Sequence, residues 1–230
     1  MKENILINPQ ELKTEADYLE LERLSLKLGI PVPMAHLEVK AELNGKVTAL
    51  YDGRSRTWTR NYWNALFASV CGIPLVVTNF GAGYISMKQV SSAVAAALAN
   101  TINLDPLSPV NNATRGIIPG RGAGAESFEG YTLTTPITHG AGANQLGFRA
   151  QAATGQNYNA GTKLFTATLQ RLFDNTSGNT IAITETAIIV YPPSMGLYFV
   201  TCRDLLAVSV DVLNNGVLTI TYIITLTFPA

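Results

Sequence analysis

The amino-acid sequence predicts a mainly β protein: an antiparallel β-sandwich, jelly-roll-like or immunoglobulin-like, with an N-terminal helix and one inserted amphipathic helix. Three observations support this. The final segment alternates apolar and polar residues, the second half of the chain repeats such runs between turn residues, and two segments in the first third carry helical spacing. Short alternating runs separated by turn signals are typical of sandwiches, because each strand buries one face.

The longest alternating run is residues 217–228, VLTITYIITLTF, which we expect to organise the fold. Side chains of a strand point alternately to opposite faces, so six large apolar groups share one face and mostly threonines share the other. The run is almost wholly β-branched or aromatic, which disfavours a helix. We expect earlier strands to pair beside it and cover its apolar face, and the threonine face to meet water.

A helix is expected over residues 8–29 at the start of the chain. Asn8 is a suitable N-cap, Pro9 suits the first helical position, and Glu11 completes a capping box. Gly29 is placed to end the helix. The sequence therefore marks both ends of this segment.

Leucines recur along the predicted helix, with Leu12, Leu19 and Leu26 seven residues apart. Such a surface needs a partner, because an isolated helix of about twenty residues is marginal in water. Two interpretations stay open: the helix docks on another subunit, or it packs on its own domain.

A stiff tether follows, because Pro31 and Pro33 each disfavour helix in the preceding residue. We therefore divide the chain into an N-terminal helical arm with a proline linker, residues 1–33, and a β-sandwich domain, residues 34–230. The arm is expected to serve assembly and the sandwich to fold around its own core.

The sandwich domain is expected to open with a β-hairpin. Alternating runs at 37–43 and 47–51 flank Asn44-Gly45. A two-residue hairpin turn needs positive φ at both positions, which Asn and Gly tolerate best.

A second helix is predicted from Ser55 to about Val70. Trp58, Tyr62, Leu66 and Val70 keep four-residue spacing and are expected to form its buried face.

Three arginines, Arg54, Arg56 and Arg60, lie at the predicted start of this helix. Nucleic-acid binding needs several cations on one face with little opposing charge, whereas the chain carries sixteen basic and sixteen acidic residues. We predict that these arginines face solvent or bridge to a neighbouring subunit. Together with Leu12, Leu19 and Leu26 they form the predicted assembly interface.

The middle of the chain is expected to hold short extended segments and turns. Leu75–Val77 suits a strand, while the alanine-rich run 91–99 has no clear polar face and residues 103–112 read as loop. The glycines at 120, 122 and 124 lack the strand-and-helix context of a phosphate-binding loop, so we interpret them as turns.

Strands are predicted over most of the remaining chain. Their ranges are 145–152, 163–173, 180–191, 197–203 and 206–212, with turns at 174–179 and 214–216. The turn segments are rich in Asn, Asp, Ser and Gly, the residues that tolerate turn conformations.

Composition limits the class of protein. Charged residues make up 14% and apolar residues 47%, which does not suggest disorder. No signal peptide and no run of about 18 apolar residues is expected, so the sequence predicts a soluble protein that contacts no membrane. Cys71 and Cys202 are expected to be buried free thiols.

No catalytic, cofactor-binding or metal-binding residues are predicted. His36 and His139 lie far apart in sequence, and no Gly-x-Ser-x-Gly elbow occurs. Glu126 and Glu129 could form a glycosidase pair only beside a ring-binding cleft. We therefore expect no enzymatic activity and no cofactor.

A series of short motifs runs from residue 36 to the end. They are Arg-Ser-Arg-x-Trp-x-Arg-Asn-Tyr at 54–62, Gly-Ile-Ile-Pro-Gly at 116–120, Ser-Phe-Glu-Gly-Tyr-Thr-Leu at 127–133, His-Gly at 139–140, Asn-Thr-Ser-Gly at 175–178, Ile-Ala-Ile-Thr-Glu at 181–185, Arg-Asp-Leu at 203–205 and Leu-Thr-Ile-Thr-Tyr at 218–222. In this order they resemble a family of tailed-bacteriophage virion proteins. Pro119 departs from the β-branched residue expected there.

The resemblance implies a structural component of the virion, made in the host cytoplasm, that contacts copies of itself and other virion proteins. Its place on the capsid, neck, tail or baseplate stays open, and no specific nucleic acid is expected as a partner. The alternative is a receptor- or carbohydrate-binding module of the virion, which exposed Trp and Tyr in the loops would favour. Both tryptophans lie instead in the predicted second helix.

Overall fold

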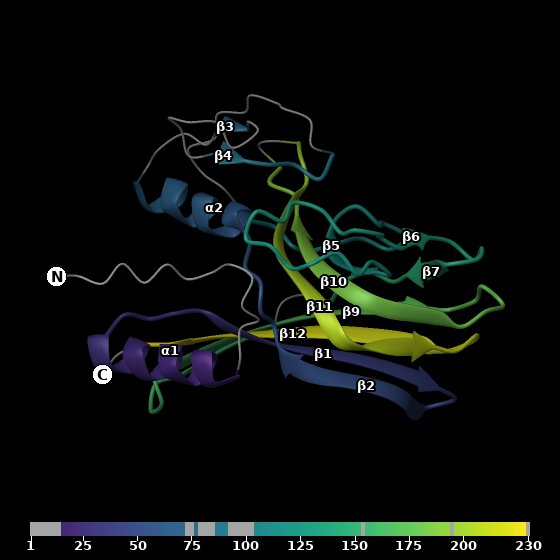
Figure 1. Ribbon diagram of the computed structural model, residues 1–230, viewed down its shortest axis with the longest axis horizontal. Helices are drawn as coiled ribbons and strands as arrows, with labels where there is room; N and C mark the ends of the chain where they lie inside the picture. Colours follow the sequence, from purple (N-terminus) through teal and green to yellow (C-terminus); the bar gives the residue numbers. More distant parts are fainter. Residues whose placement is uncertain are drawn as a thin grey trace.

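The computed structural model describes residues 15–71, 76–77, 86–91, 104–152, 155–193 and 196–228. Within these residues the protein is mainly β, as predicted, with two helices and mostly antiparallel sheets (Figure 1). The large sheet has the order β2-β1-β12-β9-β7-β6, with β8 beside β9, and the small sheet has the order β11-β10-β5. A two-stranded sheet joins β3 and β4.

The elements have the following bounds: α1 Glu15–Leu28, β1 Met34–Leu43, β2 Lys46–Arg54, α2 Arg60–Cys71, β3 Val76–Val77, β4 Ser86–Met87, β5 Gly116–Gly120, β6 Thr138–His139, β7 Gln145–Phe148, β8 Gly155–Asn159, β9 Leu164–Asp174, β10 Ile181–Val190, β11 Phe199–Val212 and β12 Val217–Thr227.

The last strand is central to the large sheet, as predicted. β12 pairs antiparallel with β1 along one edge and with β9 along the other. Leu218, Ile220 and Tyr222 are completely buried and face the small sheet across the core. The alternation of apolar residues therefore identified the core face from Leu218 to Tyr222, but the expectation that the whole apolar face is covered is wrong at Phe228, which is 39% exposed.

The expectation that the threonine face of β12 meets water is wrong for Thr219 and Thr221, which are each only 7% exposed. A central strand has long side chains on both sides. Lys40 of β1 pairs in register with Thr219, and the Gln170 side chain donates to Thr221 Oγ1 at 3.2 Å. These neighbours cover the threonines.

The first hairpin forms as predicted. β1 and β2 are joined by Asn44 and Gly45, whose φ angles are 52° and 74°. β1 buries Leu37, Val39 and Ala41 on alternate positions. The pairing shifts once, between Ala41 and Glu42, because Thr48 is left out of the ladder, so a bulge separates the register set by the turn from the register of the buried residues.

The small sheet differs from the prediction in one respect. The segments 197–203 and 206–212 were predicted as two strands, but they form one long strand, β11, which pairs with β10. The pairing shifts between Ile183–Val210 and Glu185–Leu205, so a bulge takes up the extra residues of β11 without ending the strand. Val208 stands out into solvent there.

The second helix begins later than predicted, at Arg60, because the chain before it is bound to β11. Thr59 donates its N–H to the Thr201 carbonyl at 3.0 Å, and Trp58 forms a β-bridge with Cys202. The predicted start at Ser55 therefore falls in extended chain.

The predicted buried face of this helix is wrong at Leu66, although Trp58 and Tyr62 are partly buried. Asn61 and Ala65 are buried, whereas Leu66 is 42% exposed. Asn61 fixes the orientation, because its side chain donates to the Val200 carbonyl and accepts from the Lys88 N–H. The Val70 side chain lies outside the described residues.

Several other predictions fall wholly or mostly outside the described residues. These are the helix start at Asn8 to Glu11, Leu12, the side chain of Cys71, Leu75 and most of the run 91–99. Cys202 is a buried free cysteine, as predicted, Val76–Val77 forms a short strand, and residues 104–112 form loop and turn.

Candidate functional site

The first helix lies at one end of the sandwich, beside the ends of β1 and β12 (Figure 1). It ends where predicted: Gly29 has φ 64° and donates to the Leu26 carbonyl, and Ile30 donates to the Ser25 carbonyl at 3.1 Å. These two hydrogen bonds form a Schellman motif, which satisfies carbonyls that the helix leaves unpaired. β1 begins at Met34, directly after the proline stretch.

The contact between α1 and the sandwich is polar. The Tyr18 hydroxyl donates to the Arg56 carbonyl at 3.1 Å, and Arg54 forms an ion pair of 2.7 Å with Glu22. The Arg54 guanidinium also lies over the Tyr18 ring, 5.4 Å from its centre. Burial raises the pKa of Tyr18, so its hydroxyl stays protonated and keeps donating at neutral pH.

The leucines of α1 keep a large part of their surface exposed. Leu19, Leu21, Leu24, Leu26 and Leu28 are all exposed, from 37% for Leu24 to 63% for Leu28. We call these five residues the leucine surface. Clusters of exposed apolar residues mark interaction sites, since isolated ones are common but contiguous patches are not.

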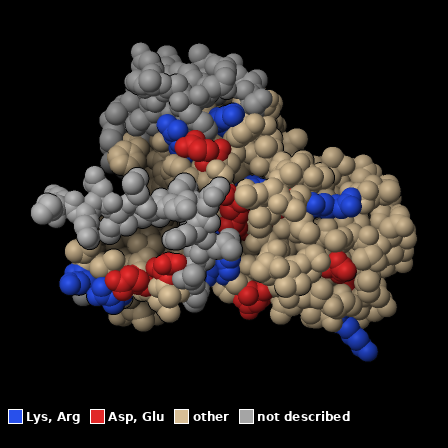
Figure 2. All heavy atoms as spheres, in the orientation of Figure 1, with Lys and Arg blue, Asp and Glu red and all other residues tan. Residues whose placement is uncertain are grey.

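Charged side chains of both signs accompany the leucine surface, whereas they are sparse over most of the face in Figure 2. Glu20 and Arg23 form an exposed ion pair of 2.6 Å on α1, and Lys27 lies in its last turn. Leu26 also borders a cavity of about 130 Å³ between the helix and the end of the large sheet. Met34 of β1 and Thr225 of β12 line the same cavity.

The predicted interface residues fall in two places. Leu19 and Leu26 lie on α1, and Arg54 and Arg56 lie beneath it, so the structure brings these four together. Arg60 begins α2 and pairs within the chain with Glu129 at 3.2 Å. The role of these residues in assembly stays a prediction.

Sequence reasoning did not identify Tyr18 and Glu22, which attach α1 to the sandwich. The signal for them was present: Tyr18, Glu22 and Ser25 recur at spacings of four and three, so they lie on one side of a helix.

Residues of two of the motifs form a buried ion pair between the small sheet and the loop that follows β5. Arg203 of β11 lies 2.8 Å from Glu185 of β10, with side chains 5% and 0% exposed. The carboxylate also accepts the N–H groups of Gly122, Thr134 and Thr135 at 2.8–3.1 Å. The pair therefore fastens the glycine-containing loop to the small sheet.

Two of the glycines in this loop are needed for close approach to Glu185. A Cβ atom on either Gly120 or Gly122 would collide with the Glu185 side chain. The carbonyls of Gly124 and Ala125 accept hydrogen bonds from Arg203. The interpretation of these glycines as turns is wrong for Gly120, which is the last residue of strand β5, and the loop that follows wraps a buried side-chain pair.

A second buried group, Asp204, attaches the chain before α2 to the same sheet. Its carboxyl accepts from the Ser55 hydroxyl at 2.8 Å and from the Arg56 N–H. The Cys202 thiol and Tyr222 hydroxyl donate to it at 3.3 and 3.1 Å, and burial raises the pKa of both groups well above their ordinary values. Both therefore remain protonated donors at neutral pH.

Burial also raises the pKa of Asp204, and this predicts a pH dependence of stability. The pKa of Asp204 in the folded state exceeds its unfolded value of about 3.9. The stability that Asp204 contributes is therefore fully present below about pH 3.9 and is lost as the pH rises through the folded-state pKa. Urea titrations of the wild type and Asp204→Asn between pH 7 and pH 4.5 measure the free energy of unfolding of each protein. As pH falls, the free energy of unfolding of the wild type should rise relative to that of the variant. The gain is up to about 1.4 kcal/mol per pH unit. A relative loss towards acid pH would show that the folded protein stabilises the carboxylate.

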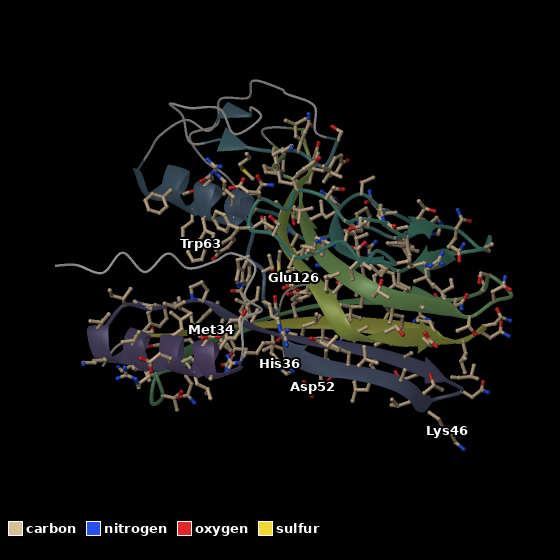
Figure 3. The ribbon with its side chains drawn as sticks, in the orientation of Figure 1. Met34, His36, Lys46, Asp52, Trp63 and Glu126 are labelled. Carbon is tan, nitrogen blue, oxygen red and sulfur yellow. The ribbon has the colours of Figure 1, made fainter. Side chains whose placement is uncertain are left out.

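The remaining candidate groups take part in local bonds. His36 lies beside Asp52, with Nε2 to Oδ1 at 2.6 Å (Figure 3), and His139 Nδ1 accepts the Phe148 N–H. Glu126 accepts the Leu205 N–H at 2.9 Å. Among the residues that the structure describes, no cluster of three His, Cys, Asp or Glu side chains could hold a metal ion, and no helix could cross a membrane.

One further cavity, of about 230 Å³, opens on the outer side of the small sheet. Ile118, Leu133, Ile189 and Tyr198 give it an apolar lining, with Gln89 and Thr114 as polar members. None of its lining residues is charged, so it suits an apolar group.

Comparison of the chain with protein-family models, with curated proteins and with solved structures finds no match.

Proposed function

We propose that this chain is a structural subunit of a tailed-phage virion, made in the host cytoplasm and assembled through repeated contacts with copies of itself and with other virion proteins. It acts by binding and has no catalytic activity. The observation that carries the proposal is the leucine surface of α1. Polar contacts of Tyr18 and Glu22 attach this helix to the end of the sandwich.

The motifs that resemble phage virion proteins support the proposal through their position. Glu185 pairs with Arg203 and Tyr222 pairs with Asp204, so motif residues that are far apart in sequence form two buried contacts, one on each face of the small sheet. These residues stabilise the fold, as expected if the motifs shared with phage virion proteins are structural.

Removal of residues 1–33 tests the proposal. The contacts of α1 are partly exposed ion-pair and hydroxyl bonds, each worth roughly 1 kcal/mol or less. The truncated protein should therefore stay folded, with a melting temperature lowered by no more than about 8 °C. It should fail to enter phage particles when it replaces the full chain, as judged by mass spectrometry of purified particles.

Val47→Thr provides the matched control, because Val47 is an exposed apolar residue on β2, away from α1. This variant should enter particles normally. If the truncated protein unfolds, residues 1–33 belong to the sandwich core; if it folds and enters particles, they are no assembly element.

A further inference from the structure

Two Asn-Gly pairs lie in turns of this protein, and the structure gives them different surroundings. Asn44-Gly45 forms the tip of the hairpin between β1 and β2, and Asn215-Gly216 belongs to the turn between β11 and β12. The φ angles of Asn44 and Asn215 are nearly the same, 52° and 62°. The difference between the two pairs therefore lies in what holds each turn, and not in this backbone angle.

The Asn44-Gly45 tip stands free at the end of the large sheet opposite α1 (Figure 1). Both residues are exposed, and the side chain of the next residue, Lys46, points away from the sheet (Figure 3). Among the residues that the structure describes, none accepts the Gly45 N–H or bonds to the Asn44 side chain. A Cβ atom built on Gly45 would meet no atom within 4 Å. The tip is therefore free to rotate about the bonds of Asn44.

The Asn215-Gly216 turn is held by backbone hydrogen bonds on both sides. Asn215 donates its N–H to the Asn175 carbonyl at 2.7 Å, and Gly216 donates its N–H to the Leu213 carbonyl at 2.9 Å. The Gly216 carbonyl in turn accepts the Asn175 N–H at 2.9 Å. Gly216 is buried, and a Cβ atom there would lie 3.0 Å from the Glu42 carbonyl oxygen. Rotation at this turn must break these bonds.

The chemistry that depends on this freedom is deamidation of asparagine. The main-chain nitrogen of the next residue gives its proton to solvent and attacks the asparagine Cγ; the N–Cγ bond forms, the Cγ–Nδ2 bond breaks, and ammonia leaves. One water then opens the five-membered imide. Opening at Cγ gives aspartate, and opening at the main-chain carbonyl carbon gives isoaspartate, whose main chain runs through Cγ. Glycine favours the attack because it has no side chain to obstruct it.

The hairpin can accept both products without disturbing the core. Asp-Gly suits the same two-residue turn as Asn-Gly. Isoaspartate adds one carbon to the main chain at the tip, but the pairing of β1 with β2 already shifts between Ala41 and Glu42. This bulge separates the tip from the buried residues Leu37 and Val39. A change of register at the tip therefore stays outside the core.

We propose that Asn44 is a site of spontaneous modification. The folded protein converts it to aspartate and isoaspartate through the imide with Gly45, with water as the only co-reactant, whereas the hydrogen bonds around Asn215 protect that residue. The new carboxylate lies beside Lys46 at the exposed tip. This conversion needs no partner and is independent of the proposed virion role.

Ageing of the full chain at mildly alkaline pH tests this, with one sample folded and one unfolded in guanidinium chloride. Trypsin then releases residues 41–46, with Asn44 as their only asparagine. Mass spectrometry with fragmentation follows Asn44 and Asn215, and an isoaspartyl methyltransferase labels isoaspartate. The two sites should react at similar rates in the unfolded chain. In the folded protein Asn44 should react at least about tenfold faster than Asn215 and should yield isoaspartate.

Asn44→Gly is the control, because Gly-Gly suits the same turn and has no side-chain amide to lose. Its peptide 41–46 should gain no mass on ageing, and the melting temperature of the aged wild type should stay within about 2 °C of that of the aged variant. Asn44 that stays intact in the folded protein while the unfolded chain reacts, or equal folded-state rates at Asn44 and Asn215, would overturn the proposed site. A larger fall in melting temperature would show that the bulge does not shield the core.

Discussion

Replacing Glu185 with alanine should remove a large part of the stability of the folded protein. Arg203 would be left charged and 5% exposed, and three backbone N–H groups would lose their acceptor. Breaking a buried pair from one side costs about 3–5 kcal/mol, against a total stability of about 5–15 kcal/mol. Urea denaturation monitored by tryptophan fluorescence or circular dichroism measures the loss.

Glu129→Ala is the matched control, since it also removes a carboxylate from an arginine, but at an exposed site. Its cost should stay below about 1 kcal/mol. The double variant Glu185→Leu with Arg203→Leu should remain unstable, because the orphaned N–H groups of the loop persist. Full rescue by the double variant, or equal losses for Glu185→Ala and Glu129→Ala, would show that the carboxylate does not hold the loop.

Replacing Arg171 with methionine should also be strongly destabilising. This arginine is fully buried on β9, and no carboxylate is among its described partners. It donates to five backbone carbonyls, and the rings of Phe148 and Phe173 lie 4.8 and 5.5 Å from its guanidinium carbon. Those carbonyls belong to Pro109, Asn112, Arg115, Ile117 and Arg149.

The size of the loss follows from the carbonyls left unpaired. A buried polar group without a partner costs about 1–3 kcal/mol, so Arg171→Met should lose at least about 3 kcal/mol. Burial lowers the pKa of Arg171 to about 10, so the guanidinium is charged and donating at pH 7. Hydrogen exchange should show residues 109–117 opening first, since these carbonyls bind that segment to the sheet.

Arg149→Met is the control for this prediction. Arg149 pairs with Asp174 at the surface and is about half exposed, so its loss should cost less than about 1 kcal/mol. Equal unfolding midpoints for Arg171→Met and the wild type would mean that the buried arginine contributes nothing to stability.

The parts of the fold that depend on neighbouring residues were predictable from sequence. Asn44-Gly45 determines its turn through its own backbone preferences, and Gly29 ends α1 for the same reason. The alternation through Ile220 placed β12 because burial of one face acts at every second residue. Each of these signals lies within a few residues of the structure that it produces.

The parts that depend on distant partners were not predicted. The chain from Ser55 to Thr59 has helical spacing, yet Asp204 and Thr201 bind its polar groups from far along the sequence. Tertiary hydrogen bonds thus override the local preference. Leu66 is exposed for a related reason, because Asn61 sets the orientation of α2.

One of the buried charges left a signal that a closer reading of strand parity could have found. Arg171 lies between Leu169 and Phe173 on the inward side of β9, whereas Glu185 follows a shift in strand pairing after Ile183 and faces the loop that covers the small sheet. A charged residue at an inward position indicates a buried pair or network. Its partners could not be predicted, because backbone carbonyls and N–H groups leave no pattern in a sequence.

The most direct measurement for the proposed virion role is the number of copies of this chain in purified phage particles. Quantitative mass spectrometry, with the major capsid protein as the reference, gives that number, and immunogold labelling or cryo-electron microscopy then gives its place on the capsid, neck, tail or baseplate. A structural subunit should be present in several copies per particle, at the same ratio in every preparation. Absence of the chain from purified particles, or a ratio that falls with each purification step, would contradict the structural role.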